Sequence, residues 1–196
     1  LAALFLINNA TEAIVPNFTN FALDTLNMPP TSSTLMMAVF AVSLAAFGIP
    51  AGTLGRKFGR KKTIKIGIVM LAVCFALGYV LTTTFSSINV VMFIVFALVG
   101  FAWAAINVNS LPMVVEMCKG SDIGKFTGYY YTASMAAQVV TPIIAGTLMR
   151  NISYKVLFPY AAIFVALSFV TMTFVKHGDA KATAKKGLEA FEDMDD

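Results

Sequence analysis

The sequence predicts an all-α integral membrane protein with six transmembrane helices. Hydrophobic residues make up 58% of the chain and charged residues only 12%, whereas a soluble domain carries about 25% charged residues. The charged residues gather between apolar stretches that are long enough to cross a bilayer. One such cluster, residues 52–65, holds six of the fourteen Lys and Arg residues. This alternation of apolar stretch, basic loop and apolar stretch indicates a membrane hairpin whose loop is cytoplasmic.

Composition also excludes several classes of function. The formal charge of +4 does not indicate nucleic acid binding, because the basic residues flank apolar stretches and form no stripe interleaved with aromatic residues. An anionic membrane surface is the partner they favour. Cys74, Cys118 and the single His177 are far apart, so we expect no metal site and no cofactor. With no histidine inside the apolar stretches, a membrane-embedded enzyme is disfavoured.

Each expected span ends at a polar segment. The first stops at the proline-containing segment 27–33, in which Ser32 or Ser33 is a candidate N-cap for the second span. The basic cluster separates the second and third spans, and segment 116–125 separates the fourth and fifth. Short turns at 84–89 and 150–155 complete the pattern. The expected spans are 1–25, 34–54, 63–83, 90–115, 126–149 and 156–175, followed by a polar tail at 176–196.

The distribution of charge sets the expected orientation. Twelve of the fourteen Lys and Arg residues fall on one side: six in the basic cluster, two in segment 116–125 and four in the tail. Only Arg150 and Lys155 fall on the other side. Both ends of the chain are therefore expected in the cytoplasm, with the spans in the cytoplasmic membrane of the cell. Because Leu1 already lies in an apolar stretch, we expect the chain to be the C-terminal part of a longer protein.

The first span is unusually polar. Asn8, Asn9, Glu12, Thr19 and Asn20 fall within about a third of the helical wheel, and such a stripe normally faces the bundle interior or a water-filled cavity. Glu12 is the only acid deep inside a span, where a charge costs about 2.5–3.5 kcal/mol on insertion scales. It is a candidate for proton exchange or cation binding. The alternative is a structural carboxyl group that hydrogen-bonds Asn8 or Asn9.

The fourth and fifth spans add further candidates. The amides of Asn107 and Gln138 are suited to sugar hydroxyls, and Trp103 and Tyr131 are suited to stacking on a sugar ring. Each of these side chains is equally suited to holding helices together. Asn109 points to a different face of the fourth span from Trp103 and Asn107.

The basic cluster resembles the signature loop of the major facilitator superfamily. It follows the pattern G-x-L-x-x-[KR]-x-G-R-[KR] at Gly52, Leu54, Lys57, Gly59, Arg60 and Lys61. Over the whole chain, the spans and loops fit one half of such a twelve-helix transporter. The resemblance implies a small polar solute, alternating access and an N-terminal six-helix half as partner. Arg56 stands where the family usually has Asp, which favours the C-terminal half and weakens the transfer of that Asp's gating role.

A narrower likeness concerns three short segments. Residues 9–12, 50–52 and 188–193 are similar to those of bacterial sucrose-type and glycoside–cation symporters, which implies a sugar substrate and coupling to protons or sodium. Another solute, drug/proton antiport and a non-transporting assembly subunit are the alternatives. The candidate residues for solute binding and coupling are Asn8, Asn9, Glu12, Asn20, Trp103, Asn107, Tyr131 and Gln138.

The cytoplasmic segments also supply a candidate gate. Glu116 and Asp122 are the only acids in the two cytoplasmic loops, residues 52–65 and 116–125, and we expect at least one of them to contact an arginine of the basic cluster. Such a contact would hold the inner ends together in one state of a transport cycle. The alternative is a basic anchor that only fixes orientation. The candidate gate residues are Gly52, Gly55, Arg56, Gly59, Arg60, Lys61, Glu116 and Asp122.

Overall fold

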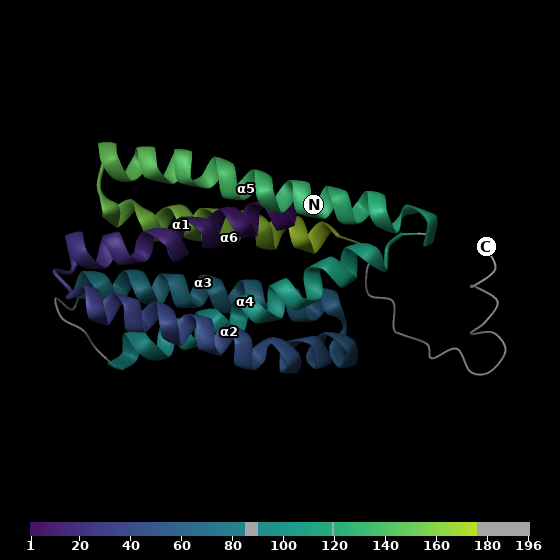
Figure 1. Ribbon diagram of the computed structural model, residues 1–196, viewed down its shortest axis with the longest axis horizontal. Coiled ribbons are helices and arrows are strands. Elements are labelled where there is room, and N and C mark those ends of the chain that lie inside the picture. Colours follow the sequence, from purple (N-terminus) through teal and green to yellow (C-terminus); the bar gives the residue numbers. More distant parts are fainter. Residues whose placement is uncertain (85–89, 119, 176–196) are drawn as a thin grey trace.

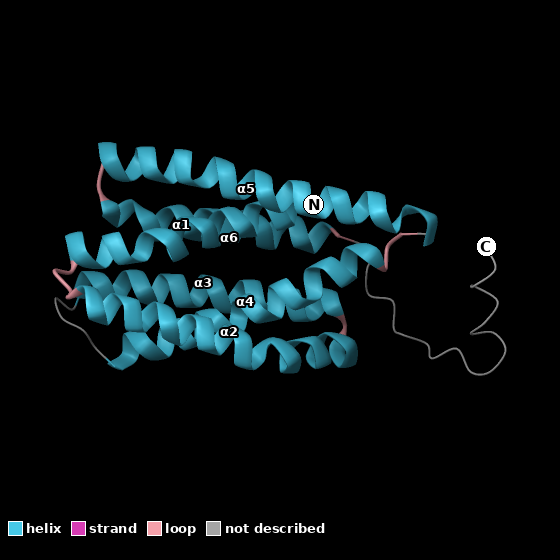
Figure 2. Cartoon of the chain, in the orientation of Figure 1, coloured by secondary structure: helices cyan, strands magenta, loops and turns pink. Residues whose placement is uncertain are grey.

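Six long α-helices lie side by side along one axis (Figures 1 and 2). The computed structural model describes residues 1–84, 90–118 and 120–175. The helices are α1 (Ala2–Thr25), α2 (Pro30–Phe58), α3 (Arg60–Thr84), α4 (Val90–Val115), α5 (Ile123–Asn151) and α6 (Leu157–Phe174), with short 3-10 turns η1 (Gly120–Asp122) and η2 (Tyr154–Val156). The described residues contain no strand, and the predicted all-α class is confirmed. The expected tail and most of the expected turn at 84–89 lie outside the described residues.

In the part of the chain that the structure describes, five helical segments are long and apolar enough to cross a membrane. They are α2, α3, α4, α5 and the continuous segment Tyr154–Phe174, which joins η2 to α6. Helix α1 has 24 residues, which is sufficient length, but its asparagines and Glu12 lower its hydropathy. Large apolar side chains such as Val42, Ile49 and Phe174 remain exposed on the outer faces. Such surfaces suit a lipid environment, since lipid tails are as apolar as these side chains.

The N-terminus of α2 differs from the prediction. The helix begins at Pro30, with Pro29 as its N-cap, and the proposed caps Ser32 and Ser33 lie inside the first turn. Proline is favoured at the first helical position because its missing N–H group would have no intrahelical partner there. Ser33 Oγ instead donates to the Pro30 carbonyl oxygen at 2.9 Å.

The basic cluster is helical, whereas the sequence predicted a loop. Helix α2 continues through Phe58 and α3 starts at Arg60, so Gly59 alone separates the two helices. Gly59 has φ = 97°, a conformation that glycine adopts without steric cost. Its N–H group donates to the Gly55 carbonyl at 3.0 Å, and its own carbonyl accepts from the Thr63 hydroxyl at 3.0 Å. The junction is therefore a fixed one-residue turn. We call this end of the bundle the basic end.

The helices form two groups of three. In one group α4 packs against α2 and α3, and in the other α1 packs against α5 and α6. The two groups are the lower and upper halves of Figure 1. Contacts between α3 and α6 join them, and so does an aromatic pair in the core: the ring centroids of Phe18 in α1 and Phe96 in α4 lie 4.3 Å apart. Within the second group, the ring centroids of Phe21 and Phe158 lie 5.4 Å apart.

Small residues allow α4 to approach α2 and α3 closely. A methyl group on Gly100 would lie 2.5 Å from the carbonyl oxygen of Phe40 in α2. A methyl group on Gly67 in α3 would lie 2.9 Å from the Ala102 carbonyl oxygen. Ser43 Oγ also donates to the Ala97 carbonyl at 2.5 Å across the α2–α4 contact. Such close contacts replace the hydrophobic driving force that helices lack inside a bilayer.

Gly100→Ala is therefore expected to lower the free energy of unfolding by about 1–3 kcal/mol, because the added methyl group forces the helices apart. Thermal unfolding of the purified protein measures this loss. Gly48→Ala in α2 is the matched control, since a methyl group there meets no atom within 4 Å. Equal losses in the two variants would contradict the packing argument.

Candidate functional site

Asn9 joins three helices. Its Oδ1 atom accepts hydrogen bonds from the Thr141 hydroxyl of α5 at 2.7 Å and from the Tyr160 hydroxyl of α6 at 3.2 Å. Its Nδ2 atom donates to the Phe5 carbonyl at 3.2 Å, and the residue is 1% exposed. The amide of Asn9 is therefore occupied by contacts inside the bundle.

Asn8 is used in a similar way. Its Nδ2 atom donates to the Leu4 carbonyl at 2.9 Å, and its Oδ1 atom accepts from the Ser134 hydroxyl of α5 at 3.5 Å. The buried Thr11 donates to the Ile7 carbonyl at 3.0 Å. The first polar residues of the stripe predicted for α1 are therefore buried, and their side chains are hydrogen-bonded.

Glu12 and Asn20 differ from these residues. Glu12 is half-buried and Asn20 is exposed. Within the described part of the chain, the side chains of both make no hydrogen bond or ion pair, so the alternative in which Asn8 or Asn9 holds the Glu12 carboxyl group is not formed here. Pro16 lies between them and is also exposed. Positions 12, 16 and 20 share one side of α1, and this side of α1 remains accessible.

Two prolines free backbone carbonyls at these candidate positions. Pro16 has no N–H group, so the Glu12 carbonyl four residues earlier lacks its usual intrahelical donor. Pro142 has the same effect on the carbonyl of Gln138 in α5. Both prolines lie inside their helices. Each candidate residue therefore offers a backbone oxygen in addition to its side chain.

The candidates on α4 and α5 are also accessible. Trp103 and Asn107 are half-buried, whereas Tyr131 and Gln138 are exposed. The amides of Asn107 and Gln138 make no hydrogen bond to other described residues. The ring of Tyr131 meets that of Tyr130 edge-on, with centroids 5.3 Å apart.

Packing between α1 and α4 fixes the depth of Glu12. Leu4 and Val114 share one apolar cluster near the basic end, and the rings of Phe18 and Phe96 touch further along. Because the two helices run in opposite directions, Glu12 is level with the middle of α4. The two α4 candidates lie at that level, within about one helical turn of it.

Hydrogen bonds fix the register of α5 in the same way. The helix runs parallel to α1, with Ser134 bonded to Asn8 and Thr141 bonded to Asn9. Gln138 lies between these two contacts along α5. The Gln138 amide and the α1 carboxyl group are therefore within about one turn of each other along the bundle axis. Glu12, Trp103, Asn107 and Gln138 thus lie at about one depth, whereas Tyr131 lies about two turns from Gln138 along α5, toward the basic end.

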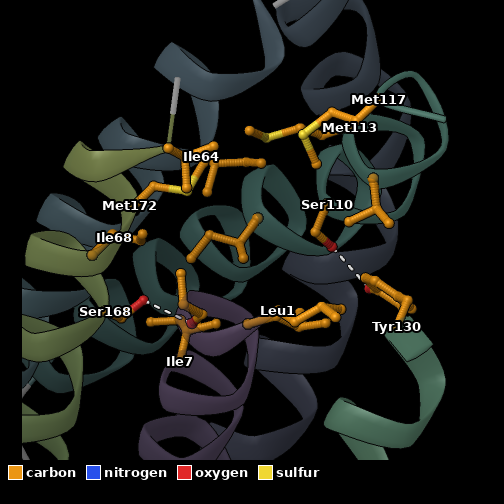
Figure 3. A pocket seen from close by; sticks show the side chains of 15 residues that line it. Leu1, Ile7, Ile64, Ile68, Ser110, Met113, Met117, Tyr130, Ser168 and Met172 are labelled. Atoms are coloured by element: carbon orange, nitrogen blue, oxygen red, sulfur yellow. Dashed lines mark hydrogen bonds between the residues drawn. The ribbon is translucent and has the colours of Figure 1, made fainter. Parts of the chain in front are cut away.

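The cavity inside the bundle is a different space. It has a volume of about 70 Å³ and is lined mainly by apolar side chains of α1, α3, α4 and α6 (Figure 3). Its polar edges are already bonded: Ser110 Oγ lies 2.8 Å from the Tyr130 hydroxyl, and Ser168 Oγ donates to the Ala3 carbonyl at 3.0 Å. None of the predicted solute-binding residues lines this cavity.

At the basic end, the expected contact between a carboxylate and an arginine is present. Arg60 Nη2 and Nε both donate to Glu116 Oε1, at 2.5 and 2.6 Å. The two side chains are 20% and 27% exposed. An ion pair with this exposure contributes only about 0–1 kcal/mol. The contact joins the start of α3 to the end of α4.

The other charged candidates at this end are placed differently. Lys61 donates to the Val175 carbonyl at the end of α6, where a cation also suits the helix dipole. Arg56 is exposed. Among the described residues, neither Arg56 nor Asp122 forms an ion pair. Of the candidate acids, Glu116 is thus the one that meets an arginine.

Sequence reasoning missed Asn109. The residue is 0% exposed and faces α2, away from the wheel position of Trp103 and Asn107. The facing segment of α2 offers Ala51 and Gly55 four residues apart. An asparagine opposite such small residues is the signal that would have found it.

Among the described residues, six long helices, most of them long and apolar enough to cross a membrane, define the fold of a multi-pass membrane protein. The sequence profile of the Major Facilitator Superfamily matches residues 1–192. The chain belongs to this family, and it is a multi-pass membrane protein.

Individual relatives agree with this assignment. The "Uncharacterized MFS-type transporter MJ1317" of Methanocaldococcus jannaschii is 26% identical over 137 residues, which are 70% of this chain and 33% of that protein. The "MFS-type transporter ppzB" of Metarhizium rileyi is 22% identical over 143 residues, 73% of this chain and 29% of that protein. The chain thus spans about a third of the length of these curated relatives.

A solved structure shows the same fold. It is the proton:xylose symporter XylE bound to 6-bromo-6-deoxy-D-glucose, with a TM-score of 0.67 and 15% sequence identity. The match covers 90% of this chain and 43% of that chain. At this identity the likeness concerns the fold alone.

The Asn9 contacts generate a stability prediction. Thr141→Val removes the hydroxyl that donates to Asn9 and keeps the shape of the side chain, so the free energy of unfolding should fall by about 0.6–1.7 kcal/mol. Thermal unfolding in detergent measures this loss. Thr132→Val is the matched control, because its exposed hydroxyl bonds only the Gly128 carbonyl of its own helix. If the control loses as much, Asn9 does not hold α5 in this way.

Proposed function

We propose that the chain is one half of a secondary active transporter, which moves a small polar solute by alternating access with a coupled proton or sodium ion. The observation that carries this proposal is the set of polar groups at mid-depth that lack a partner among the described residues. Hydrocarbon offers no hydrogen bonds, so polar groups in a spanning helix normally face other helices, water or a ligand. The set consists of Glu12, Asn107 and Gln138, with Asn20 further along α1.

The buried asparagines have a supporting part in this proposal. Asn8 and Asn9 are bonded to α5 and α6, so their amides are not free for a solute in this arrangement. These bonds hold the part of α1 that carries Glu12 against α5 and α6. The solute is bound by the accessible amides, and Trp103 or Tyr131 stacks on its apolar face.

Glu12 is the proposed coupling group. A carboxyl group at mid-depth is charged in one step of a transport cycle and neutral in another, which suits proton coupling. The freed carbonyl of the same residue adds a second oxygen ligand, and oxygen ligands also suit a sodium ion. We place the proton first because the Glu12 carboxylate is the one acid at this depth in the described residues.

A sugar is the solute class we favour. Amides that bond hydroxyls and aromatic rings that stack on a sugar face are both present at the site. The fold likeness to a proton:xylose symporter is compatible with this class. Export of a drug in exchange for protons is the second candidate, because the same carboxyl group serves antiport.

We also propose that the basic end faces the cytoplasm and that the accessible side of α1 and α5 faces an N-terminal six-helix half. The described residues of the basic end include seven cations from Arg56 to Lys125, against Arg150 and Lys155 at the other end, as the positive-inside rule requires. The Arg60–Glu116 pair then lies on the cytoplasmic side and favours the state in which this end is closed.

Glu12→Gln should abolish uphill accumulation of solute and preserve solute exchange, because the amide cannot release a proton. Vesicles containing the full-length protein, with and without a pH gradient, allow both assays. Asp24→Asn near the exposed end of α1 is the matched control and should retain accumulation. Normal accumulation by Glu12→Gln would assign Glu12 a structural role.

Glu116→Gln should shift the balance of states toward opening of the basic end by up to about fivefold, since exposed pairs contribute about 0–1 kcal/mol. Labelling of an exposed cysteine reporter from the basic side measures this shift. Asp122→Asn is the control, because Asp122 forms no ion pair in the described structure. Unchanged labelling and transport in Glu116→Gln would remove the pair from the gate.

A further inference from the structure

The amide of Asn109 connects α4 to α2. Its Nδ2 atom donates to the Ala51 carbonyl of α2 at 3.0 Å and to the Ala105 carbonyl of its own helix at 2.9 Å. Two carbonyl acceptors fix the orientation of the amide, because a flipped amide would point its oxygen at both of them. The Oδ1 atom is consequently directed away from these carbonyls.

This oxygen lies against Gly55 and has no hydrogen-bond partner in the described structure. A methyl group on Gly55 would lie 1.7 Å from Oδ1. The absence of a side chain at Gly55 therefore creates the space for the amide. A buried oxygen without a donor is rare and unfavourable, so any arrangement that lets a water molecule reach it is favoured in comparison.

The bond between Asn109 and Ala51 lies next to a position where α2 lacks one of its backbone hydrogen bonds. Pro50 deprives the Ala46 carbonyl of its helical donor, and segment 51–58 follows it. Ala51 packs with Ala104 and Ala105 of α4. Segment 51–58 leads through Gly59 directly to Arg60, whose partner Glu116 lies at the end of α4.

Segment 51–58 and Arg60 thus have two polar attachments to α4. One is the exposed Arg60–Glu116 pair, which contributes little. The other is the buried Asn109 amide. Because the buried attachment lies closer to Pro50, it determines where the rest of the segment sits.

We propose that Asn109 is a positioning residue for opening and closing at the basic end. Its Nδ2 atom holds segment 51–58 on α4 and so keeps Arg60 within reach of Glu116. Its unpartnered Oδ1 atom keeps this attachment reversible, since water satisfies the oxygen when the segment separates from α4. The role in a transport cycle rests on the proposed function, whereas the attachment itself does not.

Amide hydrogen exchange on the full-length protein in lipid nanodiscs tests the attachment. Asn109→Ala is expected to speed exchange in segment 51–58 at least tenfold, with helix α6 unchanged. Asn109→Ser, which keeps one donor, should give an intermediate rate and serves if the alanine variant does not fold. Ser110→Ala is the matched control, because its partner Tyr130 belongs to α5, and exchange in segment 51–58 should not change.

A double variant separates the amide from simple packing. In Gly55→Ala with Asn109→Ala, the new methyl group occupies space that the amide vacated. Fast exchange in segment 51–58 of the double variant would support the proposal, because the donor is still missing. Wild-type exchange there would overturn it, since filled volume alone would then be sufficient.

Transport assays distinguish this inference from the proposed function. Fast exchange in segment 51–58 together with a lower rate of solute exchange at unchanged Glu12 coupling supports the positioning role. Fast hydrogen exchange in segment 51–58 of Asn109→Ala, together with no solute movement by the wild-type protein, supports the attachment and refutes the transport function. Unchanged segment exchange in Asn109→Ala overturns the inference whatever the transport result.

Discussion

The need to satisfy polar groups away from water organises this structure. Inside a bilayer each buried donor or acceptor requires a partner from the protein, and the polar residues of α1 divide accordingly. Asn9 accepts hydrogen bonds from two hydroxyl groups, one on α5 and one on α6, and these bonds tie three helices together. Glu12, about one turn further on, has no partner in the described structure. A single helix thus supplies both Asn9, which connects helices, and Glu12, which remains without a partner in the described structure.

Close packing around α4 and a tight turn fix the positions of the residues at the basic end. Glycines at the contacts of α4 remove side chains where the backbones approach, as Gly100 of α4 does against Phe40 of α2, and Gly59 turns α2 directly into α3. A one-residue turn leaves little freedom between the two helices. Arg60 and Lys61 therefore start from a fixed position at the first turn of α3, and their bonds to the ends of α4 and α6 follow from that position.

The sequence predicted the class of fold and the helices, because apolar length and charge clusters are local properties. It failed at the basic cluster, where a run of polar residues indicated a loop. Arg and Lys are good helix formers, and only Gly59 leaves the helical conformation there. Partners were harder to predict, since Thr141 lies 132 positions from Asn9 in the sequence. Asn109 was missed because its contact with α2 depends on the absence of a side chain at Gly55, which lies on another helix.

Prolines connect these observations to the candidate site. Pro16 and Pro142 lie in α1 and α5, four residues after Glu12 and Gln138, so each weakens its helix at the turn that carries a candidate side chain. Pro50 does the same in α2 just before the segment that Asn109 holds. Rigid contacts therefore adjoin weakened turns in all three helices. Sharp bends in helices occur mostly at proline, so these three positions, each next to a packed segment, are where a change of shape in the bundle is expected to concentrate.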